Sequence, residues 1–212
     1  VAESAVVAKY RNVGQVCLSP QRFMVHSQVR DQFLETVVPK VSSLKVGVGM
    51  NEDTEIGPLI NAKQRDHVES MVKQSLTEEV KVEAGGKRPE SLEKGYFYEP
   101  TVLSNVKSDS VFTKAEVFGP VMPVMDFDDL DEVIARANDT PYGLGAYVMT
   151  QDIRKATLVS EGLEFGLVGV NTWGISSVEG PFAGWKQSGV GMESGSEGLD
   201  EYLETKLVSL GL

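Results

Sequence analysis

The lone cysteine, Cys17, is the first residue of this 212-residue chain whose position could support chemistry. It ends the run Gly14-Gln15-Val16-Cys17, between a segment of helical pattern and a predicted strand. The glycine lets the backbone bend, so that the thiol and its own N–H can both face a ligand. A thiolate there could attack a carbonyl carbon while the N–H stabilises the oxyanion. A lone cysteine is more often a small buried apolar residue, so Cys17 by itself leaves both interpretations open.

A second candidate site is Glu116-Val-Phe118-Gly-Pro120. A carboxylate, an aromatic ring and a rigid Gly-Pro bend within five residues could bind a sugar hydroxyl and a flat ring. The alternative is an ordinary turn that leads into a strand. A third candidate is the glycine-rich segment 172–195, because long loops inside compact domains are commonly functional. The alternative there is a plain surface loop.

Several familiar motifs are absent from the sequence. There is no dinucleotide G-x-G-x-x-G after a strand, no G-x-x-x-x-G-K-[ST] phosphate loop, no H-E-x-x-H and no G-x-S-x-G elbow. His26 and His67 are far apart in the sequence, and Cys17 has no second thiol to accompany it. We therefore expect no metal site.

Composition limits the partners and the compartment. The net charge of −11 disfavours nucleic acid and anionic membrane surfaces as partners, and no apolar run approaches the length of a membrane span. One cysteine allows no internal disulfide, which indicates a reducing compartment, and we expect a cytoplasmic protein. The chain begins with Val1 and has no signal-peptide pattern, so we expect a piece of a longer protein.

The elements that must position these residues alternate between helix and strand. Helical patterns cover 1–12, 28–44, 61–75, 128–138, 152–161 and 196–203. Asn61 and Asp152 are the expected N-caps of their helices. Strand patterns cover 22–26, 80–84, 96–103, 121–127, 145–150, 167–171 and 205–210. Pro39 should kink or split its helix, and Pro123 argues for an edge or irregular strand. The alternation predicts one α/β domain with a mostly parallel sheet flanked by helices.

Four segments together resemble the aldehyde dehydrogenase superfamily. They are GQVC (14–17), EVFGP (116–120), NDTPYGLGAYV (138–148) and GPFAGWKQSGVG (180–191), the last running into YLETK (202–206). Their order and spacing fit the family over essentially the whole chain. The resemblance implies the family's catalytic domain at 1–201 and its C-terminal oligomerisation strand at 202–212, and hence a homo-oligomer.

The resemblance also implies an activity, the oxidation of an aldehyde to a carboxylic acid with NAD or NADP. Cys17 matches the nucleophile, which forms a thiohemiacetal and then a thioester. Glu116 matches the carboxylate that holds the nicotinamide ribose, and Phe118 matches a neighbouring ring contact to the cofactor. Gln64 falls at about the position of a weaker ribose contact.

Within the family the sequence is most similar to succinate-semialdehyde dehydrogenases. Arg11 stands six residues before Cys17, and Ser176 opens a Ser-Ser-Val-Glu segment. In that subfamily these positions bind the distal carboxylate of the substrate, a task that suits an Arg fork and a hydroxyl. The alternative for Arg11 is a cation that faces the helix dipole. Ser19 stands where some of these enzymes carry a second cysteine as a redox switch.

The family's Rossmann domain, its general-base Glu and its oxyanion-hole Asn have no counterpart in these residues. We therefore expect the chain by itself to be inactive as a dehydrogenase, because hydride transfer needs the nicotinamide held against the substrate. Two alternatives remain. One is a dehydrogenase of another aldehyde or semialdehyde, and the other is a non-catalytic assembly module in which Cys17 is inert.

Overall fold

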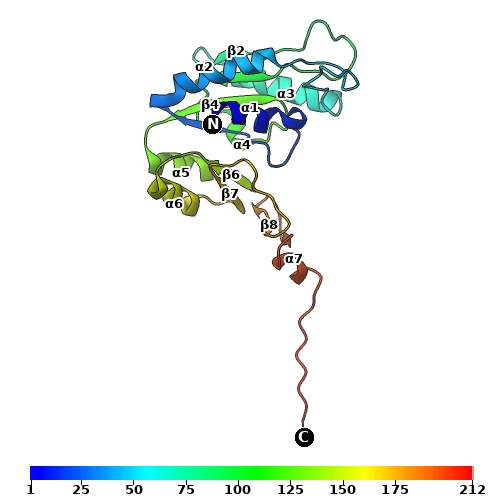
Figure 1. Cartoon of the computed structure of the whole chain (residues 1–212), viewed down its shortest axis with the longest axis vertical. Helices are drawn as coiled ribbons and strands as arrows, with labels where there is room; N and C mark the ends of the chain where they lie inside the picture. Colours follow the sequence, from blue (N-terminus) through cyan, green and yellow to red (C-terminus); the bar gives the residue numbers. More distant parts are fainter. Residues whose placement is uncertain (212) are drawn as a thin grey trace.

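The computed structural model describes residues 1–211. Helices and strands alternate along the chain, as the sequence predicts (Figure 1). The α-helices are α1 (Ala2–Tyr10), α2 (Ser27–Ser43), α3 (Ala62–Ser75), α4 (Val111–Lys114), α5 (Leu130–Asn138), α6 (Ile153–Gly162) and α7 (Glu197–Asp200). A single 3₁₀ turn, η1 (Arg11–Gly14), follows α1 directly. Every helix within this range is too short or too polar to span a membrane.

The main sheet has four strands in the order β1-β4-β3-β2. Its strands are β1 (Phe23–His26), β2 (Lys81–Ala84), β3 (Thr101–Ser104) and β4 (Val121–Phe127). The β1–β4 and β3–β4 pairs are parallel and the β2–β3 pair is antiparallel, which confirms the prediction of a mostly parallel sheet. A separate parallel pair joins β6 (Gly145–Val148) to β7 (Leu167–Val170) and lies beside α5 and α6 (Figure 1).

Strand β4 lies between two neighbours in the centre of the sheet, so the prediction of an edge strand at Pro123 is wrong. The alternative, an irregular strand, agrees with the pairing, because β4 pairs with β3 up to Pro123 and with β1 after it. Pro123 pairs in register with Leu103. Proline removes one ladder donor. The first five residues of β4 are all buried, and the packing of their side chains offsets that loss.

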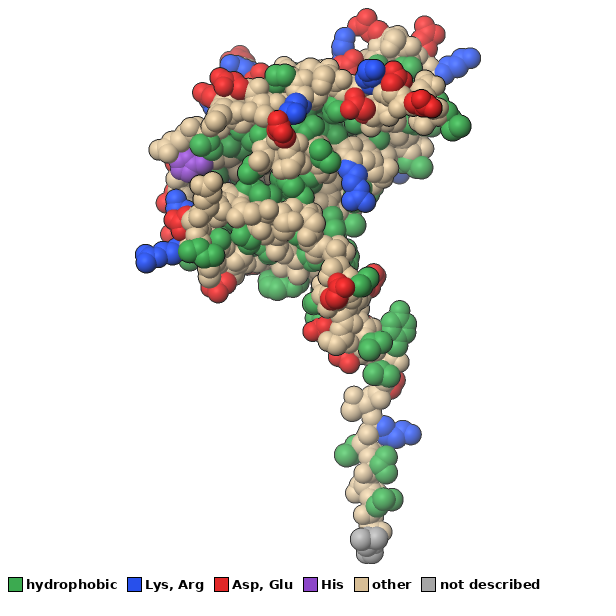
Figure 2. Space-filling view, viewed as in Figure 1, with side chains coloured by type: hydrophobic (Ala, Val, Ile, Leu, Met, Phe, Trp, Pro, Cys, Tyr) green, Lys and Arg blue, Asp and Glu red, His purple; other side chains and the backbone are tan. Residues whose placement is uncertain are grey.

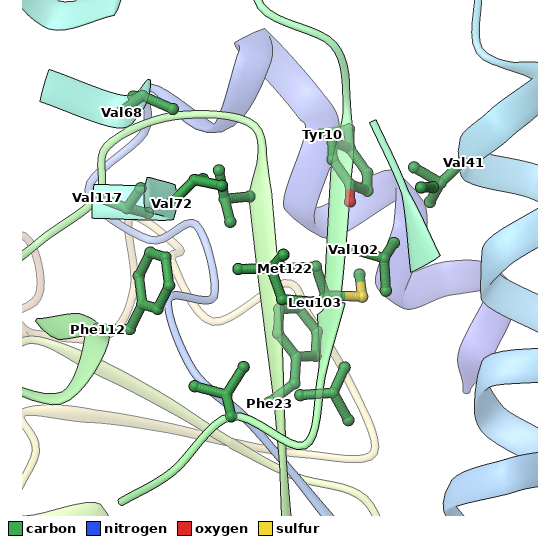
Figure 3. Packing of buried hydrophobic residues seen from close by; sticks show 14 of the residues in the cluster. Tyr10, Phe23, Val41, Val68, Val72, Val102, Leu103, Phe112, Val117 and Met122 are labelled. Atoms are coloured by element: carbon green, nitrogen blue, oxygen red, sulfur yellow. The ribbon is translucent and has the colours of Figure 1, made fainter. Parts of the chain in front are cut away.

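The hydrophobic core packs α1, α2 and α3 against these strands (Figure 3). Val102, Leu103 and Met122 are fully buried at its centre. Tyr10, at the end of α1, is buried too, and its hydroxyl donates to the carbonyl of Thr101 at 2.6 Å. This bond fixes the end of α1 on β3, and the chain leaves from that point toward Cys17.

Side-chain caps start several helices where the sequence predicts them. The Asn61 side chain accepts from Gln64 N at the start of α3, and Asp152 accepts from Arg154 N and Lys155 N at the start of α6. Pro39 does not split its helix, because α2 continues without a break to Ser43. Both Pro39 and Glu35, whose carbonyl loses its helical partner, are exposed, so water can satisfy that group.

Three other predicted segments differ from the structure. The expected strand 96–103 is reduced to β3, because Pro100 has no N–H for the ladder. The long loop 172–195 contains three two-residue strands, β8 (Phe182–Ala183), β9 (Trp185–Lys186) and β10 (Met192–Glu193), and β9 pairs with β5 (Tyr142–Gly143). Helix α7 is half as long as the predicted helix 196–203.

Residues 203–211 extend away from the body as a tail in which no strand is assigned (Figure 1). A strand needs a hydrogen-bonding neighbour, and this part of the chain has none here, so the predicted strand 205–210 does not form in the single chain. The tail and the turn before it expose large apolar side chains (Figure 2), namely Tyr202, Leu203, Leu207, Val208 and Leu210.

Candidate active site

Cys17 is exposed at the end of a strained turn that follows α1. Asn12, Val13 and Gly14 have φ values of 50°, 60° and 71°, three consecutive left-handed residues. The value for Val13 is unusual because a β-branched side chain disfavours this region. The turn is held by Asn12 Nδ2, which donates to the Gln15 carbonyl at 2.9 Å, and by Ile60 N, which donates to Gln15 Oε1 at 3.0 Å.

Gly14 brings the turn into backbone contact with the segment Glu116–Pro120. A Cβ atom on Gly14 would lie 2.3 Å from the carbonyl oxygen of Gly119, so no other residue fits without movement. The prediction that Gly14 lets the backbone bend agrees with this geometry. Two motifs about a hundred residues apart in the sequence thus meet at a point where only glycine fits.

Helix α3 holds the segment Glu116–Pro120 from the other side. Gln64 Nε2 donates to the carbonyls of Val117 at 3.1 Å and Phe118 at 2.9 Å. Val68 packs so closely on Gly119 that a Cβ there would lie 2.4 Å from its methyl group. Phe118 has a φ of 41°, a second strained residue at the site. Gln64 therefore supports the backbone that presents Phe118.

Cys17 and Glu116 line one cleft of about 960 Å³. The cleft runs between β1 and β6, which are both edge strands in the part of the chain that the structure describes. Its walls are mostly apolar and include Phe23 and Phe33. Figure 2 shows apolar side chains gathered across the middle of this face. Such a cleft with a few polar groups is typical of a small-molecule site.

Two aromatic rings stand beside the thiol in this cleft. The rings of Tyr147 and Trp173 lie 4.9 Å apart, and Tyr147 Oη donates to the Leu18 carbonyl at 2.7 Å. Trp173 Nε1 donates to Ser4 Oγ of α1 at 3.0 Å. Burial raises the pKa of Tyr147 to about 12, and the neighbouring Cys17 adds to the rise, so the phenol stays protonated. Sequence reasoning assigned no role to Tyr147, whose only signal was its place in the motif NDTPYGLGAYV (138–148).

Glu116 is the carboxylate that the family resemblance assigns to cofactor binding. Partial burial raises its pKa, and the positive charge of Lys9 opposes that rise. Lys9 is completely buried in α1, and sequence reasoning missed it because a lysine in an amphipathic helix is expected at the surface.

No group of three or more potential metal ligands occurs among residues 1–211.

Comparisons with known proteins fit this arrangement. The sequence profile of the aldehyde dehydrogenase family matches residues 1–208. The chain belongs to the aldehyde dehydrogenase family.

Individual members of the aldehyde dehydrogenase family share two-fifths or more of their residues with the chain. A probable succinate-semialdehyde dehydrogenase (NADP(+)) of Sinorhizobium fredii is 41% identical over 99% of this chain and 42% of its own length. A betaine aldehyde dehydrogenase of Bacillus subtilis is 43% identical over 97% of this chain and 42% of its own length. The crystal structure of a succinate-semialdehyde dehydrogenase from Burkholderia pseudomallei superposes with a TM-score of 0.90, at 43% identity, over 95% of this chain and 41% of that one. The chain thus spans less than half the length of these relatives.

The aldehyde dehydrogenase residues expected from the sequence are brought together only in part. Cys17, Glu116, Phe118 and Gln64 lie in or directly behind the two touching loops. Arg11 and Ser176 are exposed, and neither is among the residues that line the cleft in the described part of the chain. Their role as carboxylate ligands stays a prediction.

Proposed function

We propose that this chain is the thiol-bearing catalytic domain of an NAD(P)-dependent aldehyde dehydrogenase. Cys17 is its nucleophile, residues 1–201 form the domain, and 202–212 form the oligomerisation strand. The observation that supports this most strongly is the Gly14–Gly119 approach, which sets an exposed thiol and a carboxylate on one apolar cleft.

The thiolate of Cys17 would attack the aldehyde carbon, forming the C–S bond as the carbonyl electrons move to oxygen. The backbone N–H of Cys17 is the donor that this chain offers to the oxyanion. Glu116 and Phe118 would help to hold NAD(P)⁺, which when bound would supply the hydride acceptor that turns the thiohemiacetal into a thioester. Water would then attack the thioester carbon, break the C–S bond and release the acid with the thiol restored.

The residues on the cofactor side fit a nicotinamide ribose. The Glu116 carboxylate is exposed at the cleft and can accept hydrogen bonds from two ribose hydroxyls. Phe118, two residues further along the same loop, carries the ring that the family resemblance assigns to the cofactor. Gln64 acts through its two bonds to the loop backbone, so its contribution to cofactor binding is to fix Phe118 in place.

For the substrate we propose succinate semialdehyde, whose acid tail would bind Arg11 and Ser176. The loop of Ser176 is tied to α1 by the Trp173–Ser4 bond, and Ile175 lies beside Leu18, next to the nucleophile. Arg11 follows the last residue of the same helix. In a chain of net charge −11, Arg11 provides a local cation for an anionic substrate.

A second substrate class has one observation in its favour. The Tyr147–Trp173 pair could face a quaternary ammonium, the group that aromatic rings bind through cation–π attraction. That chemistry suits betaine aldehyde, the substrate named for the Bacillus subtilis relative. A cation in the pocket would be repelled by Arg11, so the two substrates make opposite demands on that residue.

A chimera tests the proposal. The part of the Sinorhizobium fredii relative that precedes the matched region is joined to Val1, and NAD(P)H formation is followed with succinate semialdehyde, betaine aldehyde and a short neutral aldehyde. We expect Cys17→Ser to abolish activity and Arg11→Leu to raise the KM for succinate semialdehyde alone. Activity that survives Cys17→Ser would overturn the proposed nucleophile. A lower KM for betaine aldehyde in Arg11→Leu would support the cationic substrate instead.

The chain without that preceding part is expected to form no NAD(P)H. The apolar tail is expected to pair with another subunit as an edge strand, giving a homo-oligomer. The free, exposed thiol suits a reducing compartment such as the cytoplasm. Some relatives are named as mitochondrial, among them one from Oryza sativa, and a fusion of the full protein to a fluorescent reporter would distinguish the two compartments.

A further inference from the structure

Cys17 stands at the corner of a tight turn formed by residues 16–19. The Ser19 N–H donates to the Val16 carbonyl at 2.9 Å and closes the turn, so Cys17 and Leu18 are its central residues. A single backbone bond contributes little net stability at the surface, because water competes for both of its groups. The turn therefore needs further contacts if the exposed thiol is to keep one direction.

The peptide group between Leu18 and Ser19 is bound at both of its polar atoms. Its N–H makes the turn bond to Val16, and its carbonyl oxygen accepts from Tyr147 Oη at 2.7 Å. A peptide group is planar with its N–H and C=O on opposite sides, so these two bonds fix its orientation. This plane lies one residue after Cys17, and fixing it limits the directions that the thiol and its N–H can take.

The end of the turn is also anchored to α1. The Ser19 hydroxyl is buried, donates to the Lys9 carbonyl at 3.3 Å and accepts from Lys9 Nζ at 3.5 Å. Helix α1 packs in the main core, whereas Tyr147 lies in β6, which pairs with β7 outside the main sheet. The turn of Cys17 is thus held from α1 on one side and from β6, through Tyr147, on the other.

The ring of Tyr147 is itself fixed by its neighbours. It lies against Gly169, its register partner in β7, where a Cβ atom would come within 3.2 Å of Tyr147 Cδ1. The ring of Trp173 lies 4.9 Å away on another side. The Leu18 side chain also reaches β6, since a Cβ atom on Gly145 would lie 3.0 Å from its Cδ2. The hydroxyl is therefore a donor at a position that packing determines.

We propose that Tyr147 is a positioning residue for the nucleophile: its hydroxyl holds the Leu18–Ser19 peptide, and the held turn aims the Cys17 thiol and N–H at the aldehyde. The inference rests on the proposed role of Cys17. Attack on a carbonyl needs the sulfur at one angle while the N–H faces the oxyanion, so a turn that opens spends less time in the reactive geometry. Cofactor binding, which would use the loop 116–120, does not depend on this bond.

Amide hydrogen exchange of the 212-residue chain, followed by NMR, tests whether the hydroxyl holds the turn. Tyr147→Phe keeps the ring and its packing but loses the bond to the Leu18 carbonyl. We expect the Ser19 amide to exchange about threefold to tenfold faster in this variant, as the loss of one hydrogen bond predicts. Tyr96→Phe, which removes the hydroxyl of an exposed tyrosine in another loop, is the matched control and should leave Ser19 unchanged.

The chimera tests whether the held turn matters for the reaction. Tyr147→Phe should lower kcat about tenfold, because a misplaced nucleophile reacts more slowly, and should leave the KM values for NAD(P)⁺ and the aldehyde unchanged. Tyr96→Phe should change none of the three. The pH dependence of kcat should keep its shape in Tyr147→Phe, since a positioning hydroxyl transfers no proton to the substrate.

Unchanged Ser19 exchange in Tyr147→Phe, or an equal effect in Tyr96→Phe, would overturn the proposal. So would a kcat profile that loses one limb with pH, which would make Tyr147 a proton donor instead. If Tyr147→Phe does not fold, the parent decides: a Ser19 amide that exchanges as fast as in the unfolded chain would overturn the held turn, and a protected one supports it. A chimera inactive in every form would overturn the proposed function and this role with it. An active chimera with an unchanged kcat in Tyr147→Phe would overturn the role of Tyr147 alone.

Discussion

Two loops flank Cys17, and they are held in different ways. The loop 116–120 is fixed through its backbone, by the Gly14 approach, by two bonds from Gln64 and by the packing of Val68. The loop 171–181 is held near its start, by the bonds of Asn171 to Thr150 and Val148 and by the side chains of Trp173 and Ile175. Its residues 176–179 are exposed, with one backbone bond at Val178. The difference indicates that this chain by itself holds the loops of Cys17 and Glu116, the proposed thiol and cofactor side of the site. The proposed substrate side has fewer contacts here to hold it rigidly.

The largest effect that would test this contrast is expected from Gly14→Ala. The new Cβ would meet the Gly119 carbonyl at 2.3 Å at a φ of +71°, so the two loops must separate. We expect a loss of about 2–4 kcal/mol in the free energy of unfolding, measured with urea. Gly49→Ala is the matched control, because nothing lies within 4 Å of its Cβ position. Equal stability of the two variants would show that the backbone contact between Gly14 and Gly119 leaves room for a Cβ atom.

The buried amine gives a pH-dependent effect on the same side of the site. Because the pKa of Lys9 is about 7 in the folded chain and 10.5 ordinarily, the unfolded chain binds one more proton between these values. The free energy of unfolding should therefore rise with pH from 7.5 to 9.5, by about 1 kcal/mol per unit. The rise should disappear in Lys9→Met and persist in Lys114→Met, which removes an exposed lysine. If the free energy of unfolding rose with pH in Lys9→Met as it does in the parent, the rise would belong to another group.

A smaller effect is expected from Gln64→Met, which removes both bonds to the loop 116–120 but keeps the helix and the side-chain length. We expect a loss of about 1–3 kcal/mol, because two loop carbonyls lose their partner. Gln74→Met on the exposed face of the same helix loses only a bond to Ser70 and should be nearly neutral. Urea unfolding of the two variants side by side gives the comparison.

The smallest effect should fall on the other loop. Trp173→Phe keeps an aromatic ring against Tyr147 but loses the bond to Ser4, at a cost of about 1 kcal/mol. Hydrogen exchange should become faster in 171–181 and stay unchanged in 116–120. Trp185→Phe is the control, since that ring is exposed. Faster exchange in both loops would mean that they are not independent.

The sequence predicts the local features of this structure well and the long-range ones poorly. Asn61 and Asp152 cap their helices as expected, because a cap involves only the next few residues. Pro123 predicts an edge or irregular strand, and the edge is wrong because the place of β4 in the sheet depends on β1 and β3, which are distant in the sequence. The motifs at Cys17 and Glu116 are visible in the sequence, whereas the contact between Gly14 and Gly119 that joins them is visible only in the structure. The burial of Lys9 has no signal in a helical pattern.

Alkylation of Cys17 by iodoacetamide at pH 7 is the most direct test of the central claim, that this chain presents a preformed nucleophile. The sequence holds one cysteine, so every alkylation event reports on that thiol. We predict that the folded chain reacts at least about tenfold faster than the same chain unfolded in urea, as expected for an accessible, activated thiol. Gly14→Ala should remove most of the difference. A folded chain that reacts no faster than the unfolded one would contradict the account and favour an inert cysteine in an assembly module.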